Sequence, residues 1–268
     1  MRTLVALDLD GTLLDEHACL PPGHEHAVAE LRHQGILIAI VTGRPLLTAR
    51  WIYKHLRLTT PIVTFNGGWV GYPDRGSPLA MAALNAAEVR TVIEALAGWP
   101  GALCAYPDAT TWLMDRATPH TARWSDYYGV QSEVAPQHFA AWTGPSHKLM
   151  WVAPPADLPA AVAHLRRTLG PRFLVVASQD DRCEILPAGV HKAWGLERLA
   201  AHLGVPRDRV WAVGDADNDL EMLRWAGHGC AMGQASHHVK AHARHILPGI
   251  TARGLCALPG LIARQEMR

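Results

Sequence analysis

The sequence has little of several features that define whole classes of protein. Charged residues make up only 18% of its 268 residues and the formal net charge is +1, which argues against the concentrated positive charge of a nucleic-acid-binding protein. It lacks a hydrophobic run long enough to cross a bilayer, and acidic residues at positions 8 and 10 come too early for a signal peptide. We therefore expect a cytoplasmic protein that binds neither nucleic acid nor a membrane.

Cysteine is scarce as well, and histidine is plentiful. The chain has five cysteines, an odd number without a Cys-x-x-Cys pair, which favours reduced thiols over a disulfide framework. Sixteen histidines include His238 and His242, whose i, i+4 spacing can hold a metal ion on a helix. Because the sequence offers no third ligand nearby, we interpret this segment as a solvated helix face.

The chain does contain enough apolar sequence for two packed units. Hydrophobic residues make up 49% of it, and a domain usually takes roughly 100–200 residues. Strands are predicted at residues 3–9, 36–41 and 61–65, with a helix at 24–34 between the first two. Alternation of this kind is typical of an α/β fold with a doubly wound parallel sheet, which binds ligands beyond the carboxyl ends of its strands.

The pattern changes between residues 82 and 185. Helix-like pieces at 86–96 and 158–169 mix there with strand-like pieces at 147–153 and 172–177. Strand and helix alternate again afterwards, with a helix predicted at 191–202 and a strand at 209–213. We therefore predict a core domain formed by residues 1–81 and 186–268, interrupted by an α/β domain at 82–185.

Acidic residues follow two of the predicted core strands. Asp8 and Asp10 end the first strand, and the run Gly-Asp-Ala-Asp-Asn-Asp at 214–219 follows the strand at 209–213. The carboxyl ends of parallel strands open onto the same edge, so we expect the two clusters to meet there. An Asp-x-Asp-Gly run alone would also fit an ordinary turn, but two acidic strand ends on one edge predict a Mg²⁺ site.

Two further segments offer groups that suit phosphate. Thr42, Gly43 and Arg44 end the second strand and supply a hydroxyl, backbone amides and the start of a helix. Lys192 opens the helix after the inserted domain, where its ammonium group could hold a phosphoryl oxygen and offset the charge of Asp8. A single lysine is usually just solvated. Lys192 indicates a phosphate site only because it follows the segments at Asp8 and Thr42 and precedes the acidic run at 214–219.

In order and approximate spacing, these four segments resemble the motifs of the haloacid dehalogenase-like hydrolases, and among them the Cof-like phosphatases with a large α/β cap. The resemblance spans the whole chain and implies that the domain at 82–185 is the cap. It also implies that Asp8 attacks phosphorus to give an aspartyl-phosphate, while Asp10 protonates the leaving alcohol and then activates water. The sequence departs from the family pattern at Ala193, where glycine is usual, and at Gln234, where asparagine is usual.

The same resemblance implies the remaining site residues. Mg²⁺ would be held by the Asp8 carboxylate, the Asp10 carbonyl and Asp215, with Asp219 supporting the metal site. Lys192 would be catalytic together with Asp8 and Asp10. Phosphoryl oxygens would be bound by Thr42, Gly43, Arg44, Lys192 and Asn218.

The function expected from this reading is that of a Mg²⁺-dependent phosphatase for small phosphorylated metabolites, with sugar phosphates as the favoured class. An acid/base at Asp10 favours transfer to water or to an alcohol, so a hexose phosphomutase-type phosphotransferase remains an alternative. A non-catalytic phosphate-binding module is a weaker alternative, because binding alone does not require an acid/base beside a nucleophile. We expect a monomer or a small homo-oligomer.

Overall fold

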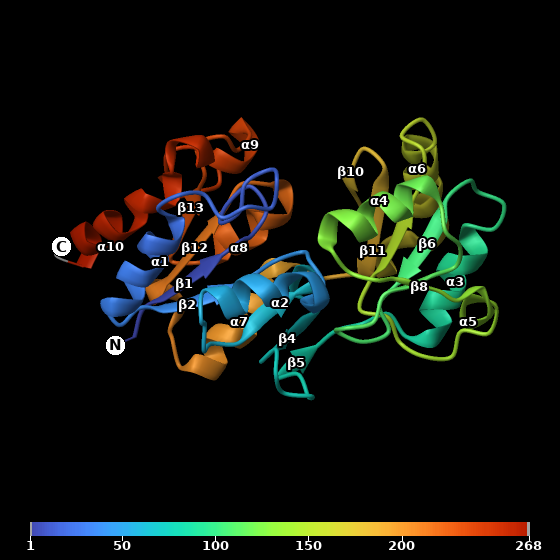
Figure 1. Cartoon of the computed structure of the whole chain (residues 1–268), viewed down its shortest axis with the longest axis horizontal. Helices are drawn as coiled ribbons and strands as arrows, with labels where there is room; N and C mark the ends of the chain where they lie inside the picture. The colour runs from blue at the N-terminus through green and yellow to red at the C-terminus, as the bar shows by residue number, and fades with distance from the viewer. Residues whose placement is uncertain (1, 267–268) are drawn as a thin grey trace. The chain divides into compact units, whose positions relative to one another are not determined.

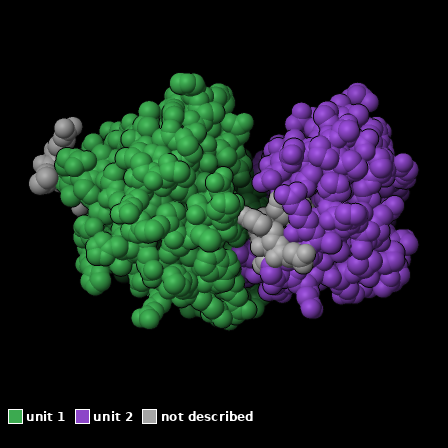
Figure 2. Space-filling view, turned by 45° about the horizontal axis from the view of Figure 1, so that its top comes forward, with its two compact units in different colours: residues 1–44, 49–80, 191–268 green, residues 45–48, 81–190 purple. Residues whose placement is uncertain are grey.

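The computed structural model describes residues 2–266, which fold into two compact units (Figures 1 and 2). The first unit is Met1–Arg44, Ala49–Ala80 and His191–Arg268, and the second is Pro45–Thr48 and Met81–Val190. Apart from the short segment Pro45–Thr48, the second unit is the continuous stretch Met81–Val190, which is inserted between Ala80 and His191 of the first unit.

The first unit is built on a five-stranded parallel sheet with the order β14-β13-β12-β1-β2. Its strands are β1 (Leu4–Leu7), β2 (Leu37–Ile40), β12 (Val210–Gly214), β13 (His228–Ala231) and β14 (His245–Ile246). All four residues of β1 are fully buried, as a central strand covered on both faces requires. Because β1 pairs with β12 from Leu4↔Val210 to Leu7↔Val213, the residues that follow the two strands emerge side by side.

Helices cover this sheet, as the sequence predicts for a doubly wound fold (Figure 1). They are α1 (His24–His33), α2 (Leu46–His55), α7 (Lys192–Leu203), α8 (Leu220–Trp225), α9 (His237–Lys240) and α10 (Leu258–Glu266). Leu196 of α7 and Leu223 of α8 share one core cluster with Leu4 and Ala6 of β1. Val5 and Leu7 alternate with those residues, so they face the other side of the sheet, and they are equally buried.

The third predicted strand exists, but its main partner differs from the expectation. β3 (Ile62–Thr64) touches the parallel sheet through one bridge, Val41↔Val63, and otherwise pairs antiparallel with β4 (Trp69–Gly71). Together with β5 (Ala80–Met81) these strands form a separate three-stranded sheet. The cause is local: Phe65, Asn66 and Gly67 all have positive φ and turn the chain back at once.

The second unit contains a six-stranded sheet in the order β10-β11-β9-β6-β7-β8. Its strands are β6 (Ala102–Ala105), β7 (Leu113–Met114), β8 (Glu133–Val134), β9 (Leu149–Val152), β10 (Phe173–Gln179) and β11 (Arg182–Pro187). Its helices are α3 (Ala86–Ala95), α4 (Pro119–Tyr128), α5 (Pro136–Ala140) and α6 (Leu158–Leu169). Trp151 of β9 packs in the core of this unit with Val92 of α3 and Leu165 of α6. The helices predicted at 86–96 and 158–169 are confirmed.

Three expectations about membranes, thiols and histidines can be compared with the structure. Within residues 2–266, no helix combines the length and the apolar character needed to span a membrane. All five cysteines are free. The rings of His238 and His242 meet edge to face with centroids 4.9 Å apart, and His242 Nδ1 lies 2.8 Å from the carbonyl oxygen of His238. One ring nitrogen of this pair is therefore already committed to the backbone.

Three aromatic rings stack across the starts of three neighbouring strands. His228 on β13 lies almost parallel to Trp211 on β12, with ring centroids 4.1 Å apart, and His245 on β14 stacks on the same tryptophan at 5.2 Å. His228 Nδ1 is 3.3 Å from His245 Nε2, so one neutral imidazole can donate a hydrogen bond to the other. Two protonated rings could not share this contact.

The surroundings of the two histidines favour their neutral forms. Burial lowers the pKa of His228 and of His245, and the charge of Arg244 lowers both further. Arg209 also lowers the pKa of His228, whereas Asp208 raises it. Because these folded-state pKa values lie below the ordinary value of about 6.5, the unfolded chain binds these protons first as the pH falls. The stability that the neutral pair provides is present above about pH 6.5 and is lost below it.

We expect His245→Gln to make the fold less sensitive to acid. Wild-type protein should lose more of its free energy of unfolding than the variant when the pH falls from about 7.5 to about 5.5, as measured by urea denaturation. His26→Gln, at an exposed histidine of α1, is the matched control and should retain the wild-type pH dependence. An equal loss in wild type and His245→Gln would contradict the proposed role of the pair.

Candidate active site

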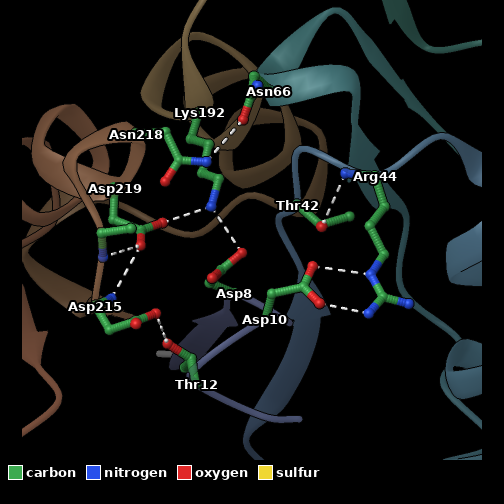
Figure 3. Close-up of polar contacts among 11 residues, drawn as sticks. Asp8, Asp10, Thr12, Thr42, Arg44, Asn66, Lys192, Asp215, Asn218 and Asp219 are labelled. Carbon is green, nitrogen blue, oxygen red and sulfur yellow. Dashed lines mark hydrogen bonds and ion pairs between the residues drawn. The ribbon is translucent and has the colours of Figure 1, made fainter. Parts of the chain in front are cut away.

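The four sequence motifs converge at the carboxyl edge of the parallel sheet. Asp8 follows β1, Thr42 follows β2, Asp215 follows β12, and Lys192 is the first residue of α7. Figure 3 shows these side chains gathered at one place, with Lys192 reaching toward Asp8. The sequence places these residues far apart, so it is the strand order that brings them together.

Three carboxylates form the acidic part of the site. Asp8, Asp215 and Asp219 each offer an oxygen, and these oxygens all lie within 4.8 Å of one another. Within the described part of the chain, this is the one group of three or more histidine, cysteine or acidic side chains close enough to hold a metal ion. The meeting of the two acidic strand ends, which the sequence predicts, is therefore present.

Small residues and a hydroxyl fix the position of Asp215. A Cβ atom on Gly11, which has a φ of +78°, would lie 2.2 Å from Asp215 Oδ2, so only glycine allows the carboxylate to approach this turn. Thr12 Oγ1 donates a hydrogen bond of 3.0 Å to Asp215 Oδ1. The turn after β1 therefore holds both the proposed nucleophile and a carboxylate from another strand end.

Asp219 supports the site through bonds to the chain around it. Its Oδ2 accepts hydrogen bonds from the backbone N–H groups of Asp215 at 2.9 Å and Ala216 at 3.0 Å. Its Oδ1 accepts from Lys192 Nζ at 2.6 Å, and the side chain is fully buried. Asp219 thus fixes the backbone beneath Asp215.

Lys192 is a buried cation shared between two acids. Its Nζ donates to Asp8 Oδ1 at 2.7 Å as well as to Asp219, and its side chain is 1% exposed. Close packing places it there: a Cβ atom on Gly195 would lie 2.4 Å from a methyl carbon of Val63. Burial lowers the pKa of Lys192, but the neighbouring carboxylates of Asp219 and Asp8 outweigh it and hold the pKa above its ordinary value.

The charges of this cluster do not balance. Burial raises the pKa of Asp8 well above its ordinary value, the charge of Asp219 raises it further, and Lys192 opposes both. Burial and the charge of Asp219 likewise raise the pKa of Asp215 to about 6. Three carboxylates against one ammonium group leave excess negative charge on hard oxygen atoms. These residues therefore fit a divalent cation such as Mg²⁺.

Asp10 points away from this cluster and toward Arg44 (Figure 3). Arg44 Nε donates to Asp10 Oδ2 at 2.8 Å, and Arg44 Nη2 donates to Asp10 Oδ1. The Arg44 side chain is 4% exposed, whereas that of Asp10 is 51% exposed. The Asp10 carboxylate is therefore outside the three-acid cluster, and the guanidinium holds the proposed acid/base at the open side of the site.

The remaining phosphate-binding candidates line the same edge of the sheet. Thr42 is buried, and its Oγ1 accepts a hydrogen bond of 3.1 Å from the backbone N–H of Arg44. Asn218 Nδ2 donates at 3.1 Å to Asn66 Oδ1. A Cβ atom on Gly43 would lie 2.8 Å from that same oxygen, so the strand end at Gly43 packs directly against Asn66.

Sequence reasoning missed three contributors to the site, namely Thr12, Asn66 and Gln234. Asn66 was recognisable as a turn residue after a strand end, and that position was the available signal for a site residue. Thr12 lies within the first motif, but nothing in the sequence pairs its hydroxyl with a residue 203 positions away. Gln234 Nε2 donates to the carbonyl oxygen of Gly11 at 2.6 Å; the sequence marks Gln234 only as a departure from the family pattern and gives no sign of this contact.

Comparison with known proteins decides the family. The sequence matches the family described as haloacid dehalogenase-like hydrolase over residues 5–256. The chain belongs to the haloacid dehalogenase-like hydrolases. The resemblance carried by the four motifs is thereby confirmed, and with it the α/β fold class.

This hydrolase is 32% identical over 253 residues to the 5-amino-6-(5-phospho-D-ribitylamino)uracil phosphatase YitU of Bacillus subtilis, with 88% of each chain covered. It is 30% identical over 251 residues to the HMP-PP phosphatase of Cronobacter sakazakii, covering 92% of this chain and 89% of that one. A solved haloacid dehalogenase-like hydrolase from Bacteroides thetaiotaomicron shares the fold, with a TM-score of 0.87 at 24% identity over 98% of this chain and 100% of that one. The hydrolase is a phosphoric monoester hydrolase.

Proposed function

We propose that this hydrolase is a Mg²⁺-dependent phosphatase of small phosphorylated metabolites and that it works through an aspartyl-phosphate at Asp8. The observation that carries the proposal is the buried contact of Asp8 with Lys192, 2.7 Å long, beside the carboxylates of Asp215 and Asp219. A plain binding site for an anion would not surround the ligand with three carboxylates. A carboxylate that attacks phosphorus next to a bound cation does require several carboxylates close together, one as the nucleophile and the others at the cation site.

In the proposed reaction, a carboxylate oxygen of Asp8 forms a bond to phosphorus while the bond from phosphorus to the leaving alcohol breaks. Asp10 gives its proton to the alcohol oxygen, then takes a proton from the water that attacks the phosphoryl group. Phosphate leaves, and the Asp8 carboxylate is restored. The exposure of the Asp10 side chain suits a group that must reach both an alcohol and a water molecule.

Asp8, Asp215 and the Asp10 carbonyl would hold the Mg²⁺ ion, which when bound neutralises charge on the phosphoryl oxygens. Lys192 contributes the same kind of stabilisation from the protein, because its ammonium group is fixed next to the attacking atom. Thr42, Gly43 and Asn218 supply hydroxyl and amide donors for the same oxygens. Lys192 and the ion together overcome the repulsion between an anionic substrate and Asp8.

The relatives suggest where to look for the substrate. The Bacillus subtilis relative is named for a phosphorylated ribitylaminouracil, and the Cronobacter relative for HMP-PP. We therefore propose a small, polar phosphorylated metabolite, with phosphates of sugars and of sugar alcohols as the first classes to assay. The first of these names describes a phosphate on a ribityl chain, which is consistent with a leaving group rich in hydroxyls.

A phosphate-release screen tests this proposal. Purified protein with MgCl₂ should release inorganic phosphate from at least one member of a panel of sugar phosphates, ribityl phosphates and other phosphomonoesters, and EDTA should stop the release. Asp8→Asn should reduce the activity by at least about 10⁴-fold, because the amide cannot act as the nucleophile. The proposal fails if no substrate is hydrolysed or if Asp8→Asn keeps full activity. Isomerised sugar phosphate without free phosphate would indicate a phosphomutase.

A further inference from the structure

Gln234 connects three strand ends next to the acidic cluster. It lies in the turn after β13, and its Nε2 donates to the carbonyl oxygen of Gly11 at 2.6 Å. Its Oε1 accepts from the backbone N–H of Ile250 at 2.9 Å. Gly11 follows β1 and Ile250 follows β14, so one side chain joins the turns after the first and the last strands of the sheet.

Backbone packing fixes the base of this side chain. A Cβ atom on Gly233 would lie 2.5 Å from the backbone nitrogen of Gly249, so the turns carrying Gln234 and Ile250 are in direct contact. Gly233 N–H also donates to the carbonyl oxygen of Pro248 at 3.3 Å. With its base and its Oε1 both held, the amide nitrogen has little freedom, and it meets the Gly11 peptide in a defined position.

The position of the Gly11 peptide controls that of Asp215. The Cα atom of Gly11 packs so closely against the Asp215 carboxylate that any side chain at position 11 would collide with it. A hydrogen bond from Gln234 also lowers the pKa of Asp215 against the effect of burial. The next residue, Thr12, donates to the same carboxylate. Moving the Gly11 peptide would therefore displace Asp215 and two of its donors together.

We propose that Gln234 is a positioning residue for the cation site: it holds the Gly11 peptide, and through it the Asp215 carboxylate, in the geometry that binds Mg²⁺. The inference rests on the proposed function but goes beyond it, because Gln234 lies outside all four motif segments. Partners that orient metal ligands commonly change metal affinity by 10–100-fold when they are removed. Gln234 acts through its neighbours and does not touch the reacting atoms.

Calorimetric titration of the metal-free protein with MgCl₂ alone tests the proposal. Gln234→Met preserves the length of the side chain but removes its hydrogen bonds to Gly11, Ile250 and Asp215, and it should weaken Mg²⁺ binding roughly tenfold. Gln234→Asn keeps the amide on a chain one methylene shorter, so it can serve Gly11 or Ile250 but not both. We expect its Mg²⁺ affinity to lie between those of wild type and Gln234→Met, and the rise in melting temperature on adding Mg²⁺ should follow the same order.

Gln34→Met is the matched control, because Gln34 is an exposed glutamine at the end of α1 that should leave Mg²⁺ binding unchanged. The proposal is wrong if both Gln234 variants bind Mg²⁺ as tightly as wild type. It is also wrong if they lower the melting temperature equally with and without Mg²⁺, since that result means a purely structural role. Wild-type protein that neither binds Mg²⁺ nor releases phosphate would overturn the proposed function as well. Active wild type with unaffected variants would overturn this inference alone.

Discussion

Lys192→Met is expected to abolish most phosphatase activity and to destabilise the metal-free protein. Among the residues that the structure describes, Lys192 carries the one ammonium group in contact with Asp8 and Asp219, and both contacts are buried. Removing one partner from a buried ionic cluster typically costs about 3–5 kcal/mol of stability, because the remaining charges are left without compensation. Loss of a fixed positive charge next to the attacking oxygen should lower kcat by about 10³-fold.

The loss of stability in Lys192→Met should depend on pH, and the direction of the change follows from the pKa values of the acids. Burial and mutual repulsion already raise the pKa values of Asp8 and Asp215, and removing Lys192 raises them further. A carboxyl group whose folded-state pKa exceeds its unfolded value of about 3.9 binds protons more readily in the folded protein, so its folded form gains stability as the pH falls. The stability deficit of Lys192→Met should therefore shrink between about pH 7 and about pH 5.

Urea denaturation in EDTA at the two pH values, together with phosphate release in MgCl₂, measures both effects. Mg²⁺ should raise the melting temperature of Lys192→Met more than that of wild type, because the ion would be the only compensating charge supplied to the three acids. Lys54→Met provides a matched control, since Lys54 is an exposed lysine 4.0 Å from Asp74 and should change neither quantity. Wild-type stability and activity in Lys192→Met would refute the buried-cation interpretation.

The sequence predicts the meeting of Asp8, Thr42 and Asp215 for a simple reason. Each residue lies within two positions of the end of an apolar strand, and parallel strands present their carboxyl ends on one edge. No side-chain contact had to be known for this step, because the backbone topology decides it. The strand periodicity and the helix at α7 are likewise local properties of the chain, which explains why they are readable from sequence.

The side-chain contacts within the site, in contrast, could not be predicted from the sequence. The sequence suggests that Arg44 binds phosphate, but it contains no signal that the guanidinium meets Asp10 or that Gln234 reaches Gly11. Such pairings depend on how turns from separate strand ends pack, and they are not periodic. The two-residue strands β7 and β8 escape prediction for a related reason, since two residues are too few to establish a period of two.

Asp10→Asn should convert the enzyme into one that becomes phosphorylated but turns over slowly. An aryl phosphate such as p-nitrophenyl phosphate has a leaving group that needs no proton, so Asp8 could still be phosphorylated in the variant. The second step needs a base for the attacking water, and an amide cannot act as one. We expect a burst of one p-nitrophenol per chain, followed by a rate about 10²–10⁴-fold below wild type.

Intact-mass spectrometry of the quenched variant should then show a gain of one phosphoryl group, and Asp8→Asn should show neither the burst nor the mass change.

The contact of Asp10 with Arg44 adds a second effect to this prediction. In wild type its guanidinium holds both carboxylate oxygens of Asp10, whereas in Asp10→Asn one of those oxygens becomes an amide nitrogen that repels the same donors. Part of the slower turnover will therefore come from displacement of residue 10. Comparing Asp10→Asn with Asp10→Ala, which loses the repelling amide, separates lost base catalysis from displacement: equal rates for the two variants would assign the whole effect to the missing base.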